Sequence, residues 1–242
     1  MKLKTLASVL LVLVIAVSCT GPKGDMGDQG PVGPAGPEQP GVYYIRHFQQ
    51  GVYGSFYAGQ VEASLFSGYG GATNTSDTLD VSIGRHTIHP SRAIFKFDIS
   101  SLPSSKVIVE KAEFTVNTNL TSLGGGAQNV GVYKVNTEWT VNQTGWIVSS
   151  TGIAWPYSGA IEPGANTVTV NTGYYDLPPD SKITIELDPA LVQDWMLNPA
   201  TNYGVILKSQ DESLLNYSEI YPSLAADTSK RPMLKIWYYT TE

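Results

Sequence analysis

The chain has 242 residues, of which 42% are hydrophobic and only 15% are charged, and it contains 14 tyrosines and 24 glycines. This composition is typical of an extracellular β protein. The formal net charge is −6. An acidic surface argues against nucleic acids and anionic membranes as partners, because neither counterion release nor surface potential would favour binding.

The first residues have the pattern of a bacterial lipoprotein signal. Lys2 and Lys4 precede an apolar run over 6–17, which is too short to cross a roughly 30 Å hydrocarbon core as a helix. Ala16-Val17-Ser18-Cys19 resembles the lipobox, in which the cysteine is lipidated. We interpret 1–18 as the signal peptide and expect Cys19 to anchor the protein by lipid in a bacterial cell envelope, outside the cytoplasm. A plain secretory signal is the alternative.

Removal of 1–18 takes away two lysines and no acid, which leaves 13 basic and 21 acidic residues and a net charge of −8. Cys19 is the one cysteine of the chain, so an intrachain disulfide is excluded.

Six consecutive Gly-X-Y triplets follow over 21–38. Glycine at every third position is what three polyproline-like chains need in order to meet at a common axis. We expect 19–41 to form a collagen-like stalk. Two arrangements stay open, a semi-rigid spacer made of one chain and a homotrimer.

The clearest strand of the remaining chain lies over 92–99. Ala93, Phe95, Phe97 and Ile99 fall on one face, while Arg92, Lys96 and Asp98 fall on the other, with Ile94 as an exception. We expect the first face to be core, the second to be at least partly exposed to water, and Pro103 to follow the strand's end. Alternating patterns predict further strands at 61–65, 79–83, 109–116, 130–135, 168–170, 182–187, 203–207, 217–221 and 233–239.

One helix is predicted after Asp188, a good N-cap, with Leu191, Val192, Trp195 and Met196 forming an apolar stripe. Asn198-Pro199 would end it. The fold class is therefore all-β: residues 42–242 should form a single jelly-roll-like antiparallel β-sandwich with one short helix. Trp139 and Trp195 are expected in its core.

The chain contains, in this order, the segments 78–81, 92–103, 111–114, 132–135 with Trp139, 187–195, 202–209 and 231–236. Together they are similar to the DNRLRE domain, a disaggregatase-related family grouped with carbohydrate-binding modules. The resemblance covers about 55–240. It implies a jelly-roll-like sandwich and, in some members, binding of polysaccharide.

Aromatic residues among Gly, Ser, Thr and Asn suggest where a sugar would bind, because sugar rings stack on flat aromatic faces. The candidate carbohydrate contacts are Trp146, Trp155, Tyr157, Tyr174 and Tyr175. For a structural calcium ion, the candidates are Asp77, Asp80 and Asp211, which are hard oxygen donors near turns. Solvated turn residues are the alternative, and no cofactor is required.

No catalytic motif is recognised in the sequence. The first hypothesis is a cell-surface lipoprotein that presents a non-catalytic polysaccharide-binding sandwich on its stalk, with the membrane contacted through the lipid alone. The second is a structural or adhesive surface protein that binds protein or extracellular matrix and trimerises through the collagen-like segment. The third is a polysaccharide-degrading enzyme.

Overall fold

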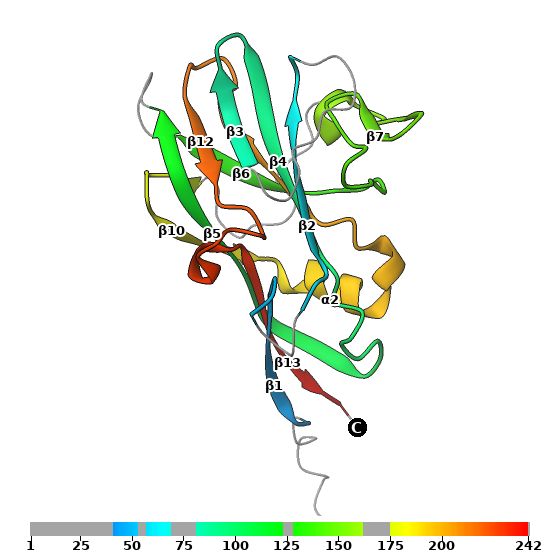
Figure 1. Cartoon of the computed structure of the whole chain (residues 1–242). Coiled ribbons are helices and arrows are strands. Elements are labelled where there is room, and N and C mark those ends of the chain that lie inside the picture. The colour runs from blue at the N-terminus through cyan, green and yellow to red at the C-terminus, as the bar shows by residue number, and fades with distance from the viewer. Residues whose placement is uncertain (1–40, 53–56, 69–80, 123–127, 162–174, 242) are drawn as a thin grey trace, which may run out of the picture. The chain divides into compact units, whose positions relative to one another are not determined.

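The computed structural model describes residues 41–52, 57–68, 81–122, 128–161 and 175–241, all within the unit Pro40–Glu242 (Figure 1). The predictions for the signal peptide, Cys19 and the Gly-X-Y triplets lie outside these residues. So does the strand predicted at 168–170.

Strands dominate the described part of the chain, and the prediction of an all-β antiparallel sandwich with one short helix is confirmed. The strands are β1 (Tyr43–Gln49), β2 (Gln60–Phe66), β3 (Val81–His86), β4 (His89–Phe97), β5 (Val107–Ser122), β6 (Asn129–Lys134), β7 (Val148–Ser150), β8 (Ile153–Ala154), β9 (Tyr175–Asp176), β10 (Lys182–Leu187), β11 (Val205–Ser209), β12 (Tyr217–Ile220) and β13 (Met233–Thr240). The helix is α2 (Pro189–Leu197), and the 3-10 turns are η1 (Ser158–Ala160), η2 (Pro199–Thr201) and η3 (Thr228–Lys230).

The strands form two layers that share the long strand β5. In the first layer β1 pairs with β13, β13 with the first half of β5, and β5 with β10. In the second layer β4 pairs with β2, β3 and β11, and β6 lies between β11 and β9. β12 pairs with β3 and with the second half of β5, so β5 connects the two layers. All these pairings are antiparallel.

The main core lies between the two layers. Phe95 and Phe97 of β4 meet Phe114 of β5, with ring centres 5.2 and 5.8 Å apart. Leu234 and Ile236 of β13 are also buried here. The prediction that Phe95 and Phe97 belong to the core is confirmed.

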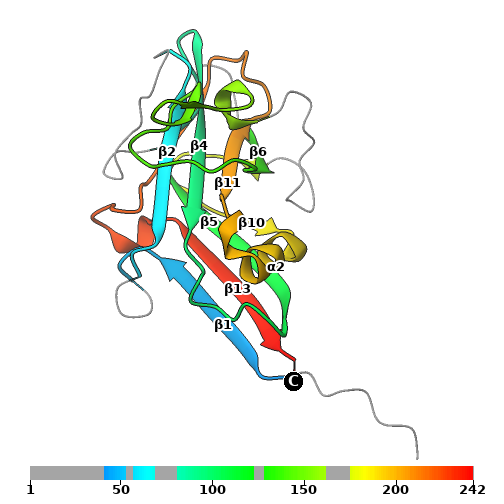
Figure 2. The ribbon, with the colours of Figure 1, turned by 90° about the vertical axis from the view of Figure 1, so that its right-hand side faces the viewer.

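A second core covers the opposite face of β4. Its buried members are Ala63, Leu65, Ile94, Tyr133, Val135, Trp139, Trp155 and Ile206. The segment over 136–161 supplies its two tryptophans, and Figure 2 shows this segment crossing in front of β2, β4 and β11. We call this cluster the outer core. It explains why Ile94 breaks the alternation: Ile94 faces the outer core and not solvent.

The second face of β4 is partly exposed to water, as expected, but only toward the end of the strand. Arg92 on this face is 8% exposed, and solvent reaches the face mainly toward its end, at Asp98. The strand also ends earlier than expected, at Phe97. The Asp98 side chain accepts a hydrogen bond from the Ser100 N–H at 2.9 Å, so a turn ends the strand well before Pro103.

α2 has the predicted bounds and cap. The Asp188 carboxylate accepts a hydrogen bond from the Ala190 N–H at 2.9 Å, and Pro189 occupies the first turn. The stripe of Leu191, Val192, Trp195 and Met196 is buried in the main core. The expectation that Trp195 is a core residue is thus confirmed.

Candidate functional site

The aromatic residues predicted to contact sugar do not form one exposed strip among the described residues. Trp155 is 5% exposed in the outer core, and its indole N–H donates to the Gly145 carbonyl at 2.8 Å. Trp146 packs partly buried against the same core, and Tyr175 packs against the main core. Tyr157 is 44% exposed, and Tyr174 lies outside the described residues. A ligand could not stack on Trp155 here.

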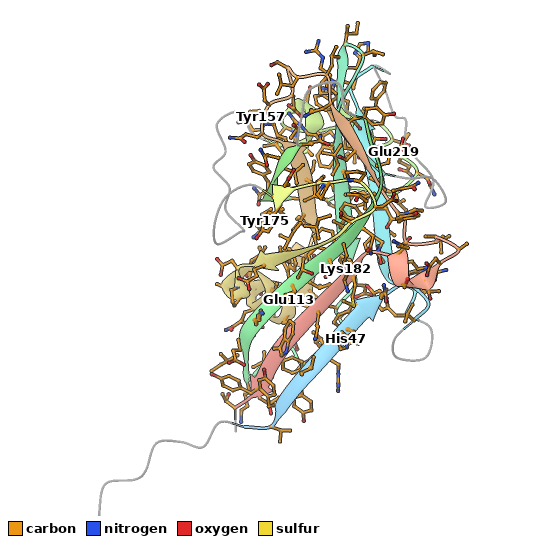
Figure 3. The ribbon with its side chains drawn as sticks, turned by 90° about the vertical axis from the view of Figure 1, so that its left-hand side faces the viewer. His47, Glu113, Tyr157, Tyr175, Lys182 and Glu219 are labelled. Atoms are coloured by element: carbon orange, nitrogen blue, oxygen red, sulfur yellow. The ribbon has the colours of Figure 1, made fainter. Side chains whose placement is uncertain are left out.

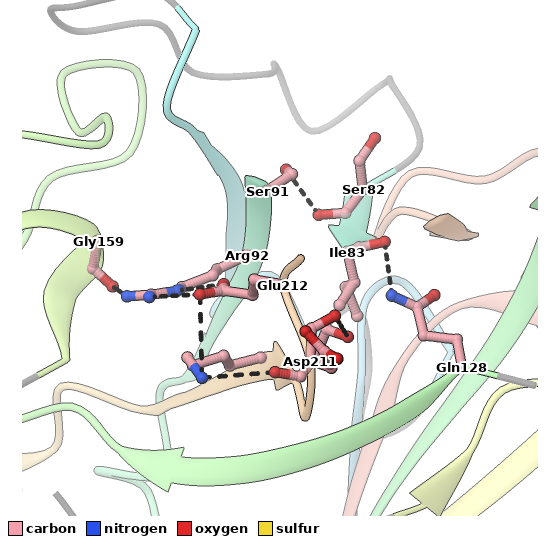
Figure 4. Close-up of polar contacts among 10 residues, drawn as sticks. Ser82, Ile83, Ser91, Arg92, Gln128, Gly159, Asp211 and Glu212 are labelled. Atoms are coloured by element: carbon pink, nitrogen blue, oxygen red, sulfur yellow. Dashed lines mark hydrogen bonds and ion pairs between the residues drawn. The ribbon is translucent and has the colours of Figure 1, made fainter. Parts of the chain in front are cut away.

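Arg92 holds the aromatic segment over 146–160 against the second layer. Its guanidinium binds the Glu212 carboxylate with two hydrogen bonds of 2.8 and 2.9 Å, and it donates a third, of 2.8 Å, to the Gly159 carbonyl (Figure 4). The same group lies 4.6 Å from the centre of the Trp146 ring. One buried cation therefore joins β4, the segment over 146–160 and the chain beyond β11.

Trp139 is anchored in a similar way. It is 3% exposed, and its indole N–H donates to the Tyr203 carbonyl at 2.8 Å. Its expected place in a core is confirmed. The aromatic residues over 139–155 thus build the outer core. They do not form an exposed binding surface.

A sheet surface with exposed aromatic and charged side chains lies on the outward side of the first layer. Along β13, Leu234, Ile236 and Tyr238 are buried, while Met233, Lys235, Trp237 and Tyr239 alternate with them and are half-exposed. No described element covers this side along 235–239. We call the outward side chains of β1, β13, β5 and β10 the open face. Figure 3 shows His47, Glu113 and Lys182 on it.

Strand register arranges the open face in rows. The row at the end of β13 contains Tyr43, Tyr239 and Ile108. Next come Ile45, Trp237 and Lys111, and then His47, Lys235, Glu113 and Glu186. The open face therefore changes from apolar to charged along the strands, with Trp237 at the boundary.

Trp237 lies among charged side chains. The Lys235 ammonium is 4.3 Å and the Lys111 ammonium 5.2 Å from its ring centre. Lys111 also forms ion pairs with Glu113 at 2.7 Å and with Glu186 at 3.6 Å. The hydrogen bond to Glu113, together with the nearby carboxylates, raises the pKa of Lys111, so its ammonium stays charged over the physiological range.

Two further groups on the open face have shifted pKa values. Burial lowers the pKa of His47, and the charge of Lys235 lowers it further. Burial raises the pKa of Tyr43, as does a hydrogen bond between its side chain and Glu110. Because β13 lies between β1 and β5, Tyr43 reaches across β13 to make this contact.

Two open depressions lie along the first layer. One, of about 410 Å³, is lined by Tyr43, Glu110, Lys111, Ala112, Glu186, Leu187, Pro189 and Trp237. The other, of about 180 Å³, is lined by Gln49, Thr115, Asn117, Lys182, Ser229, Arg231 and Met233. Aromatic, amide, hydroxyl and charged groups therefore line these two depressions, which suits a ligand with an apolar face and many hydroxyls.

The described residues show no arrangement of calcium ligands around the candidate aspartates. Asp77 and Asp80 lie outside the described residues. Asp211 accepts a 2.8 Å hydrogen bond from the Ser213 N–H, and the hydrogen bonds from Ser213 lower its pKa. Across the described ranges, no group of three or more His, Cys, Asp or Glu side chains is placed to hold a metal ion. A structural calcium ion stays a prediction.

The sequence interpretation missed the open face because it assigned 233–239 to a strand without deciding which side faced inward. The signal was present in the alternation of Lys111 and Glu113 with Ala112 and Phe114. This alternation shows that one face of β5 is polar. The pairing of β5 with β13 then places Lys235 and Trp237 on the same side as that polar face.

No model of a known protein family and no curated protein sequence matches this chain. The resemblance to the DNRLRE domain therefore stays a prediction. Within the described part of the chain, no helix is both long and apolar enough to cross a membrane.

Proposed function

We propose that this protein is a bacterial cell-surface lipoprotein whose β-sandwich binds polysaccharide without catalysis, through the open face. The observation that carries the proposal is the position of Trp237. It is half-exposed on an uncovered part of the sheet, beside two lysines and close to two carboxylates. The candidate contacts thus move from the segment over 146–175 to β1, β13, β5 and β10.

Sugar recognition requires two kinds of group at once. The C–H face of a sugar ring packs on an aromatic ring, while its hydroxyls need donors and acceptors nearby. Trp237 offers the ring once a sugar displaces the Lys235 and Lys111 ammonium groups from its face. The two lysines then offer donors, and Glu113 and Glu186 offer acceptors. These groups project from paired strands, so the sheet itself fixes their spacing.

The proposed location depends on the N-terminal sequence. Lipid on Cys19 would hold the chain to a membrane, and residues 21–38 would separate the sandwich from it. A protein that binds polysaccharide outside the cell would benefit from such a spacer, because the ligand is large and cannot enter a crowded membrane surface.

Binding to a glycan array, using the chain from Thr20 onwards, tests the proposal. We expect at least one polysaccharide to bind and Trp237→Ala to abolish the signal. Tyr157→Ala is the matched control, because Tyr157 is an exposed aromatic residue in the segment over 146–161 and not on the open face. Absence of binding to any glycan would contradict the proposal.

A further inference from the structure

Exposed apolar side chains gather where the described chain begins. Val42 is 62% exposed, Tyr43 51%, Ile45 42% and Ile108 38%. Tyr43 and Ile45 lie on β1, which pairs only with β13 among the described strands. Ile108 joins them through β13, because both Tyr43 and Ile108 are opposite Tyr239. We call these four residues the apolar tip.

The sequence that precedes the apolar tip identifies a partner for it. Six Gly-X-Y triplets occupy 21–38, and only three residues, 39–41, separate the last triplet from Val42. A collagen-like helix forms only when three chains associate, because each glycine lies at the shared axis. Association of the triplets would bring three copies of Val42 together, and with them three copies of the apolar tip.

We propose that the apolar tip is the surface through which three copies of this chain pack against one another, next to the collagen-like segment. Tethering makes the contact effectively intramolecular, so a patch too small to hold free monomers together is sufficient. The exposed Ile and Tyr side chains would then be buried at the axis of a threefold assembly. Six triplets are few, and the tip would add the contacts that hold the chains in register.

The trimer would also strengthen the binding of polysaccharide. Three open faces presented from one stalk would bind a repeating polysaccharide with greater avidity than one face. The charged row of His47, Lys235, Glu113 and Glu186 is two rows away from Tyr43 and Ile108 and one row away from Ile45, which lies opposite Trp237. Packing at the tip would therefore leave the charged row accessible and place Trp237 at the edge of the packed surface. The trimer does not depend on glycan binding, and its test is independent of it.

Sedimentation equilibrium on the chain from Thr20 onwards tests the proposal. We expect the mass of a trimer for the wild type. Ile45→Lys should raise the protein concentration at which half the chains are trimeric at least tenfold, because it introduces three charges near one axis. Ile88→Lys is the matched control, since Ile88 is 69% exposed in the turn between β3 and β4. It should leave the trimer unchanged.

A second measurement is disulfide cross-linking between copies of the chain. Without Cys19 the chain has no cysteine, so an Ile108→Cys variant can form a disulfide only with another copy. We expect oxidation to produce covalent dimers readily, and an Ile88→Cys control to produce none. A monomeric wild type at all concentrations would overturn the proposal. A trimer that Ile45→Lys leaves intact would also overturn it, because the triplets alone would then hold the chains together.

Discussion

The guanidinium of Arg92 lies 4.6 Å from the centre of the Trp146 ring while it forms a two-bond ion pair with Glu212. The side chains of Arg92 and Glu212 are 9% and 19% exposed. This arrangement fastens the segment over 146–160 onto the outward side of the second layer. It helps to hold the outer core closed over that side of the sandwich.

Removal of Arg92 should destabilise the fold. Among the described residues, Arg92→Met leaves the Glu212 carboxylate with Lys208, at 3.9 Å, as its remaining ion-pair partner. Breaking a largely buried ion pair from one side costs roughly 3 kcal/mol. Lys208→Met removes the weaker partner and should cost less than about 1 kcal/mol. Urea unfolding measures both values. Equal losses for the two variants would show that Arg92 does not have this anchoring role.

Trp155 should matter for stability and not for binding. It is 5% exposed, and its indole N–H is hydrogen-bonded, so Trp155→Ala leaves a cavity in the outer core and an unpaired Gly145 carbonyl. We expect a loss of about 3–5 kcal/mol in the free energy of unfolding. Tyr157→Ala, at a 44% exposed position, should cost less than about 1 kcal/mol. A small loss for Trp155→Ala would argue that the outer core is loosely packed.

The stability of the sandwich should fall as the pH drops below about 6.5, the ordinary pKa of histidine. Burial and the charge of Lys235 lower the pKa of His47 in the folded state. The unfolded chain therefore takes up a proton first, and stability is lost progressively until the pH has fallen through the folded-state pKa.

His47→Gln tests this pH dependence. Urea midpoints measured at pH 7.5 and 5.5 should differ less for His47→Gln than for the wild type. His89→Gln serves as the control, because it leaves the surroundings of His47 unchanged. If the wild type and His47→Gln lose the same stability between these two pH values, His47 is not the responsible group.

Many strands of the fold were predictable because they carry a local signal of alternating apolar and polar residues. The strand at 182–187 has the predicted bounds, and the helix after Asp188 has the predicted cap and buried stripe. β1 was not predicted, since Tyr43 to Gln49 show no clean alternation of apolar and polar residues. Local pattern fails there because β1 is an edge strand with exposed residues on both of its sides, Tyr43 and Ile45 on one and Arg46 on the other.

The location of the open face could not be read from the sequence for a different reason. Period-two alternation shows that two sets of side chains face opposite ways, but it does not show which side is covered. Both sides of 233–239 carry aromatic residues, Trp237 on one and Tyr238 on the other. Only the arrangement of the layers shows that Tyr238 is buried, that Trp237 is half-exposed, and that Trp146 and Trp155 pack in the same outer core as Trp139.

The measurement that tests the account most directly compares glycan affinity between Trp237→Ala and Tyr157→Ala. Isothermal titration with the polysaccharide identified on the array should show at least a tenfold loss for Trp237→Ala, which corresponds to about 1.4 kcal/mol. Tyr157→Ala should stay within about twofold, and circular dichroism should show that both variants are folded. An unchanged affinity for Trp237→Ala, or a large loss for Tyr157→Ala, would contradict the assignment of the open face as the polysaccharide-binding surface.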